Sequence, residues 1–104
     1  MKRSFFEAVK NRRTYYGISK ESPISDSAIQ EIVSEAVKHA PSAFNSQSAR
    51  VVLLFGAQHD RLWDSTKEEL RKIVPAEAFK ATEDKINGAF KSGYGSVLFF
   101  EDNA

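Results

Sequence analysis

Two short clusters of polar side chains in this 104-residue chain are candidates for a binding site. The first cluster comprises Arg12, Arg13 and Thr14, which place two guanidinium groups and a hydroxyl on adjacent residues. Arginine binds phosphate oxygens through two parallel hydrogen bonds, and a hydroxyl adds a short donor beside it. The alternative is that the arginines complement the negative C-terminal end of a preceding helix, which requires no ligand.

The second cluster lies in the segment HAPSAFNSQSAR, where Pro41 and Ser42 are followed by Asn45 and Gln47. An amide side chain both donates and accepts hydrogen bonds, so Asn45 and Gln47 can match the donors and acceptors along the edge of a heterocycle. The alternative is a polar loop whose side chains bond their own backbone. The residue types alone leave both interpretations open.

Composition excludes several classes of function. Fifteen basic and fourteen acidic residues give a net charge of +1, so no overall field attracts nucleic acid or an anionic membrane. The absence of cysteine excludes disulfides, thiolate metal sites and thiol catalysis, and two histidines do not suggest a metal site. The longest apolar run, from Val51 to Phe55, is far shorter than the ~20 residues of a membrane span. We therefore expect one small cytoplasmic domain that binds neither nucleic acid nor membrane.

The periodicity of apolar residues predicts the helices that position the two clusters. Ser4 and Glu7 form a capping box at the start of a helix that runs to about Asn11. Ser25 caps a second, amphipathic helix, which Pro41 ends at Ala40. Two further helices are predicted, one from about 62 that ends at Pro75 and one from about 79 that ends near Gly93.

Two continuous apolar segments, 51–55 and 96–101, predict strands. Continuous rather than alternating apolar character is typical of a sheet that helices cover on both faces. The intervening helices permit either a parallel or an antiparallel pair, and two strands alone make a poor sheet. We expect either that the chain is part of a longer protein or that a partner chain completes the sheet.

Taken in order, the segments NRRTYYGI, HAPSAFNSQSARVVLLFG, VPAEAFKATEDKI and SGYGSVLFFED resemble the N-terminal half of the FMN-dependent nitroreductase family. They are most similar to its small fungal-type subgroup, sometimes described as fatty-acid-repression proteins. The resemblance covers essentially the whole chain. It implies an α+β, nitroreductase-like fold whose central sheet is covered by helices on both faces and is incomplete in this chain. Residues 1–104 would then be the N-terminal half of a single domain.

The resemblance also assigns roles to both clusters. Arg12, Arg13 and Thr14 match the family's RRS segment, which holds the phosphate and ribityl chain of FMN. The family's PSxxNxQ segment lies along the flavin ring, typically on flavin bound mainly by the other subunit; the residues that match it are Pro41, Ser42, Asn45 and Gln47.

This sequence departs from the family pattern at three positions. Tyr16 stands where many relatives have a further basic residue, and Ser48 and Ala49 stand where many have proline and tryptophan. These differences are typical of the divergent subgroup, and they leave the substrate preference open.

The implied function is that of a homodimeric flavoprotein that uses NAD(P)H to reduce nitroaromatics, quinones or similar small acceptors. The cofactor would carry the difficult chemistry, so no catalytic acid, base or nucleophile is expected among these residues. One alternative is a flavin-binding dimer with a sensing or regulatory role and little turnover. Another is a structural fragment that cannot hold FMN.

Overall fold

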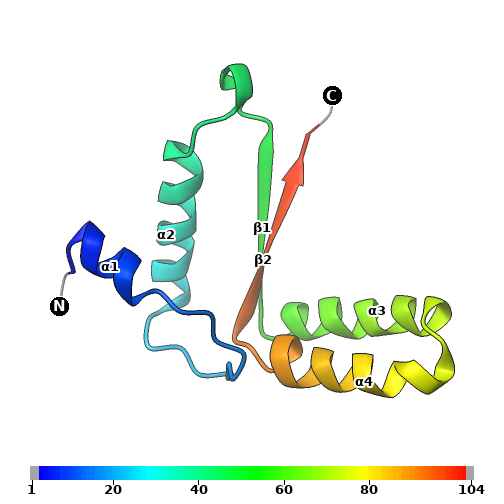
Figure 1. The fold of residues 1–104 in the computed structure, drawn as a ribbon. Helices are drawn as coiled ribbons and strands as arrows, with labels where there is room; N and C mark the ends of the chain where they lie inside the picture. Colours follow the sequence, from blue (N-terminus) through cyan, green and yellow to red (C-terminus); the bar gives the residue numbers. More distant parts are fainter. Residues whose placement is uncertain (1–2, 103–104) are drawn as a thin grey trace.

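The computed structural model describes residues 3–102 and shows an α+β arrangement (Figure 1). None of the helices in this range is long and apolar enough to cross a membrane. The elements, in chain order, are α1 (Phe5–Asn11), α2 (Asp26–His39), the short 3₁₀ turn η1 (Ala43–Asn45), β1 (Ala49–Phe55), α3 (Ala57–Ile73), α4 (Ala76–Ile86), the π-helical segment η2 (Asn87–Lys91) and β2 (Gly95–Glu101).

The two strands pair antiparallel in a single sheet, which settles the direction that the sequence left open. The register places Ala49 opposite Glu101 at one end and Phe55 opposite Gly95 at the other. The loop that precedes β1 therefore lies beside the end of β2. The helical hairpin of α3 and α4, which connects the strands, lies at the opposite end of the sheet (Figure 1).

The chain is more extended than a compact domain of its length. Its radius of gyration is 16.8 Å, whereas about 13 Å is typical of 100 residues. The strand residues Val52, Phe99 and Phe100 keep exposed apolar side chains. In the described part of the chain, the helices therefore leave part of the sheet uncovered, as expected of an incomplete sheet.

The predicted ends of the first two helices are confirmed. The Ser4 hydroxyl accepts a hydrogen bond from the Glu7 amide, and the Glu7 carboxylate accepts one from the Ser4 amide, so the capping box is complete. The Ser25 hydroxyl accepts from the amide of Ala28 at the start of α2. At the other end of α2, Ala40 is extended, as the following proline requires.

Helix α3 begins five residues earlier than its apolar pattern predicts, because a histidine occupies the first core position. His59 precedes Leu62 and Trp63 by three and four residues, so it lies on the same helix face. It is almost fully buried, at 1% exposure. The apolar pattern of the sequence does not include His59, so its place in the core is not predicted.

The buried imidazole is held by a hydrogen-bonded network that connects α3 with β2. His59 Nε2 lies 3.1 Å from the Lys91 carbonyl oxygen, which can only accept, so Nε2 carries the proton. Nδ1 then accepts from the Ser96 hydroxyl at 2.7 Å, and that hydroxyl accepts from Trp63 Nε1 at 2.9 Å. Trp63 also stacks on Phe90, with 5.0 Å between ring centroids. The helical hairpin is thereby anchored to the start of β2.

A second contact joins the start of β2 to α2. The Tyr94 hydroxyl donates a hydrogen bond to the Asp26 carboxylate, and this bond raises the pKa of Tyr94 above its ordinary value. The Gly93 backbone approaches Ile18 so closely that an added Cβ would lie 2.7 Å from the Ile18 Cδ1. The loop between α1 and α2 is therefore packed against the turn that leads into β2.

Replacing Ser96 with alanine tests the buried network. Ser96→Ala would leave both Trp63 Nε1 and His59 Nδ1 without a partner, and we expect it to lower the free energy of unfolding by about 2–4 kcal/mol. Thermal or denaturant unfolding measures this loss. Ser65→Ala, an exposed substitution on α3, is the matched control. Equal stabilities of the two variants would contradict the network's role.

Candidate functional site

The second polar cluster lines a groove between the end of α2 and the start of β1. The cavity has a volume of about 590 Å³, within the range of small-molecule sites. Its apolar lining includes Val37, Val51 and Phe99. The predicted site residues that the structure brings together at this groove are Pro41, Ser42, Asn45 and Gln47.

The backbone of this loop adopts an unusual conformation. Phe44, Asn45 and Gln47 all have positive φ angles, between 51° and 54°, which are uncommon for residues other than glycine. Two hydrogen bonds within the loop support this conformation. The backbone N–H of Gln47 donates to the Ser42 hydroxyl at 3.1 Å, and the backbone N–H of Asn45 donates to the Ser42 carbonyl at 3.0 Å. Ser42 therefore serves the loop itself, as the local interpretation of the sequence suggested.

The amide side chains of Asn45 and Gln47 are used differently from Ser42. Both residues are exposed, and neither side-chain amide forms a hydrogen bond within residues 3–102. Two donor–acceptor groups thus stand on the rim of an apolar groove and remain available to a ligand. Phe44, in the same loop, is completely exposed, and its residue type alone does not mark it as part of a site.

The first polar cluster follows the end of α1. Arg13 Nη1 donates to the carbonyl oxygens of Lys10 and Arg12, each at 2.8 Å, so its guanidinium caps the end of the helix. Arg12 Nη1 lies 3.5 Å from the Thr14 hydroxyl, and all three cluster residues are exposed. Helix capping thus uses the Nη1 group of Arg13 and leaves its other nitrogen donors available. The Arg12 and Thr14 side chains lie side by side.

The two clusters lie in different connections of the chain. Arg12, Arg13 and Thr14 directly follow α1 and precede α2, whereas Pro41 and the groove loop follow the last turn of α2. None of the first cluster's residues lines the groove. Within one chain, the structure does not bring the two clusters together.

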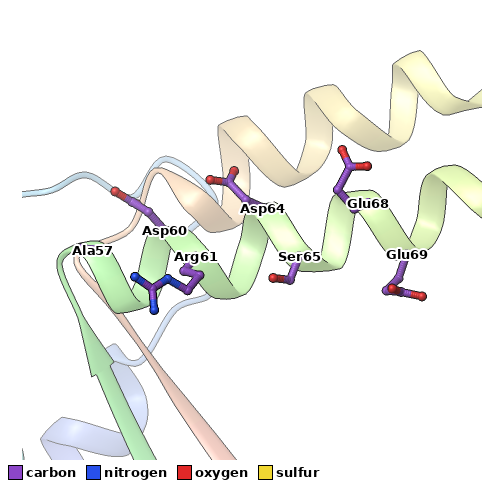
Figure 2. A pocket seen from close by; sticks show the side chains of 7 residues that line it. All are labelled: Ala57, Asp60, Arg61, Asp64, Ser65, Glu68 and Glu69. Carbon is purple, nitrogen blue, oxygen red and sulfur yellow. The ribbon is translucent and has the colours of Figure 1, made fainter.

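A second hollow lies on α3 and has a different character. Figure 2 shows that all seven of its lining residues belong to this one helix and that Asp60, Asp64 and Glu68 do not converge on a common point. Asp60 pairs with Lys20 at 2.7 Å and Asp64 with Lys91 at 2.8 Å. No group of metal-ligating side chains occurs among residues 3–102. The hollow is therefore a charged helix face whose carboxylates already have partners.

The chain belongs to the nitroreductase family, whose profile matches residues 9–104. It is 36% identical over 101 residues to nitroreductase FRM2 and 33% identical over 102 residues to the putative nitroreductase HBN1, both from Saccharomyces cerevisiae. The matches cover 95% and 96% of this chain but only 49% of each relative. The chain thus spans about half the length of the curated relatives that it matches.

The fold of this family is also shown by solved structures. The nitroreductase CinD from Lactococcus lactis, in its complex with nicotinic acid, superimposes with a TM-score of 0.79 at 39% sequence identity. The superposition covers 95% of this chain and 49% of that chain. The nitroreductase-like α+β fold expected from the sequence is confirmed for the part of the chain that is described.

The ion pair between Lys20 and Asp60 should make the stability of the fold depend on pH. The hydrogen bond from Lys20 Nζ is the main cause that holds the pKa of Asp60 below its ordinary value. A lowered folded-state pKa stabilises the fold above the ordinary pKa, and this contribution is lost as the pH falls through the folded-state value.

We expect Lys20→Met to raise the pKa of Asp60, as followed by NMR titration of its carboxyl carbon. Lys80→Met is the control, because Lys80 pairs with Asp84 on α4 and should leave Asp60 unchanged. An unchanged Asp60 titration in Lys20→Met would show that the pair does not form in solution.

Proposed function

We propose that this sequence forms part of an FMN-dependent oxidoreductase that transfers electrons from NAD(P)H to a small aromatic acceptor, and that it acts as a homodimer. Nitroreductases generally use a flavin and are generally dimeric, and membership of that family supports the proposal. Because the chain covers only half of its relatives, we further propose that residues 1–104 form the N-terminal half of one nitroreductase-like domain.

The observation that carries the proposal is that the side-chain amides of Asn45 and Gln47, on the rim of an apolar groove, have no hydrogen-bond partner within the described residues. Such a groove suits the planar, largely apolar body of a flavin ring, and the amides suit the polar atoms along its edge. Within the described residues, neither the Asn45 nor the Gln47 side chain forms a hydrogen bond with the backbone of the loop. This favours the ligand-binding interpretation of these two residues over that of a self-bonded loop.

In this proposal Arg12, Arg13 and Thr14 bind the phosphate end of the cofactor. Their exposure leaves room for an anion, and Arg13 has donors beyond the Nη1 group that caps α1. Arginine remains charged at any physiological pH, so the attraction to a phosphate does not depend on pH.

The separation of the two clusters favours a site shared between two copies of the chain. If FMN contacts both clusters, one copy would supply the guanidiniums and the other would supply the amides. A two-fold dimer contains two such sites, each related to the other by the symmetry axis. Bound FMN would supply two-electron transfer, and the residues named here would bind and orient it and the acceptor.

Aromatic acceptors are supported by the relatives. CinD has been solved with nicotinic acid, chloramphenicol and 4-nitrophenol, all of which are small aromatic compounds. The apolar lining of the groove in the present chain, which includes Val51 and Phe99, suits a compound of that class.

The visible absorption spectrum of the purified protein tests the proposal. We expect an oxidised-flavin spectrum that bleaches on anaerobic addition of NAD(P)H and returns when a quinone or nitroaromatic is added. A flavin spectrum that NAD(P)H does not bleach would instead favour a binding or sensing role. A protein that stays colourless after incubation with FMN at its full native length would contradict the proposal.

Mixing two defective variants tests the shared site. Arg12→Ala with Arg13→Ala should weaken FMN binding at least about tenfold, since charge-assisted contacts to phosphate are lost. Asn45→Ala with Gln47→Ala should alter the flavin spectrum and weaken binding at the other cluster.

Co-expression of the two variants should restore normal FMN binding to about a quarter of the sites, because half the dimers are mixed and each mixed dimer has one intact site. The matched control is co-expression of the arginine variant with itself under a second affinity tag, which should restore nothing. If mixing also restores nothing, although mixed dimers are isolated, the two clusters do not share a site across subunits.

A further inference from the structure

The groove loop is tied to the end of β2 by a set of polar contacts. The Asp102 amide donates to the Ser48 carbonyl at 2.9 Å, which extends the antiparallel pairing one step beyond the strands. The Ser48 hydroxyl donates to the Glu101 carboxylate. Ser48, the residue that follows Gln47 along the loop, is thus bonded to two residues that lie more than fifty positions away in the sequence.

Arg50 joins these contacts directly to the backbone of Gln47, which lines the groove. Arg50, Ser48, Glu101 and Asp102 together form a clamp on the loop. Its Nη1 donates to the carbonyl oxygens of Gln47 and Ala49, each at 3.0 Å. Its Nη2 donates to the Asp102 carboxylate at 3.2 Å. One planar guanidinium therefore holds the peptide of a groove residue while it is itself held by the end of β2. Lysine has a single nitrogen and cannot make the same set of contacts in that geometry.

The loop needs such support because its own conformation is unfavourable. Asn45 and Gln47 both have positive φ angles, which persist only where the surroundings enforce them. Within the described residues, the Gln47 backbone is fixed by two hydrogen bonds, one from its amide to Ser42 and one from Arg50 to its carbonyl. Removal of the second bond leaves the carbonyl side of this peptide unrestrained.

We infer that Arg50, held by Asp102, is a positioning residue that fixes the orientation of Gln47 at the groove. The inference rests on the proposed function in so far as the ligand is FMN. The arrangement of the loop itself does not depend on that assignment. Arg50 needs no contact with the ligand, because it acts through the Gln47 backbone.

The test compares two arginine variants of the protein at its full native length. Arg50→Ala removes the clamp, whereas Arg71→Ala is a matched control, because Arg71 has similar exposure and pairs with Glu68 and Glu83 far from the groove. The first readout is the rate of hydrogen exchange at the backbone N–H of Gln47 in the absence of FMN. We expect it to accelerate about five- to tenfold in Arg50→Ala and to be unchanged in Arg71→Ala.

The second readout is the FMN dissociation constant together with the absorption spectrum of the bound flavin. We expect Arg50→Ala to raise the dissociation constant about fivefold and to shift the spectrum. Asp102→Asn keeps an oxygen acceptor for Arg50 and should stay close to wild type in both readouts. If Arg50→Ala fails to fold, Arg50→Lys is measured in its place and should show the same changes at smaller size.

The outcomes separate this inference from the proposed function. Unchanged exchange at Gln47, or equal acceleration in Arg50→Ala and Arg71→Ala, would overturn the positioning role. Faster exchange with unaltered FMN binding would show a clamp that does not serve the ligand, which also overturns it. A wild-type protein that binds no FMN would refute the proposed function, and the positioning of Gln47 would then be judged by exchange alone.

Discussion

The antiparallel pairing of β1 with β2 is the constraint on which the rest of this structure depends. It joins segments that lie about 45 residues apart in the sequence and fixes both of their ends at once. At one end the pairing places Ser96 under the α3 residues His59 and Trp63, so the helical hairpin is anchored there. At the other end it places Asp102 beside Arg50, next to the groove. A slip of one residue in the register would turn every side chain to the other face and break both sets of contacts.

A second constraint is the separation of the two polar clusters. The guanidiniums follow α1, the amides follow α2, and none of the residues of the first cluster lines the groove. The proposal of a site shared between two copies rests on this separation. The uncovered part of the sheet and the exposed Phe44 agree with a chain that is completed by further contacts. The geometry of a single copy thus bears on its assembly as well as on its ligand.

Much of the fold could be predicted from the sequence because its signals are local. Capping residues and Pro41 set the limits of the first two helices, and unbroken apolar runs marked the two strands. The start of α3 is not predicted, because His59 occupies a core position and its burial is favourable only through the Ser96 hydroxyl and the Lys91 carbonyl, both far away in the sequence. The polar residues of the candidate site could be named from their types. Their separation, the positive φ angles and the role of Arg50 could not, because each depends on tertiary contacts.

The groove loop illustrates how a segment can be held by residues that are distant in the sequence. Ser48, which follows Gln47, lacks the covalent restriction of φ that a proline would provide. It offers a hydroxyl instead. The hydroxyl bonds Glu101, and Arg50, two residues further on, bonds both Asp102 and the Gln47 carbonyl. The loop is thus held by hydrogen bonds with β2 rather than by a ring within the backbone. Because those bonds are exposed to solvent, each is weak by itself, and the loop depends on the strand pairing that brings them together.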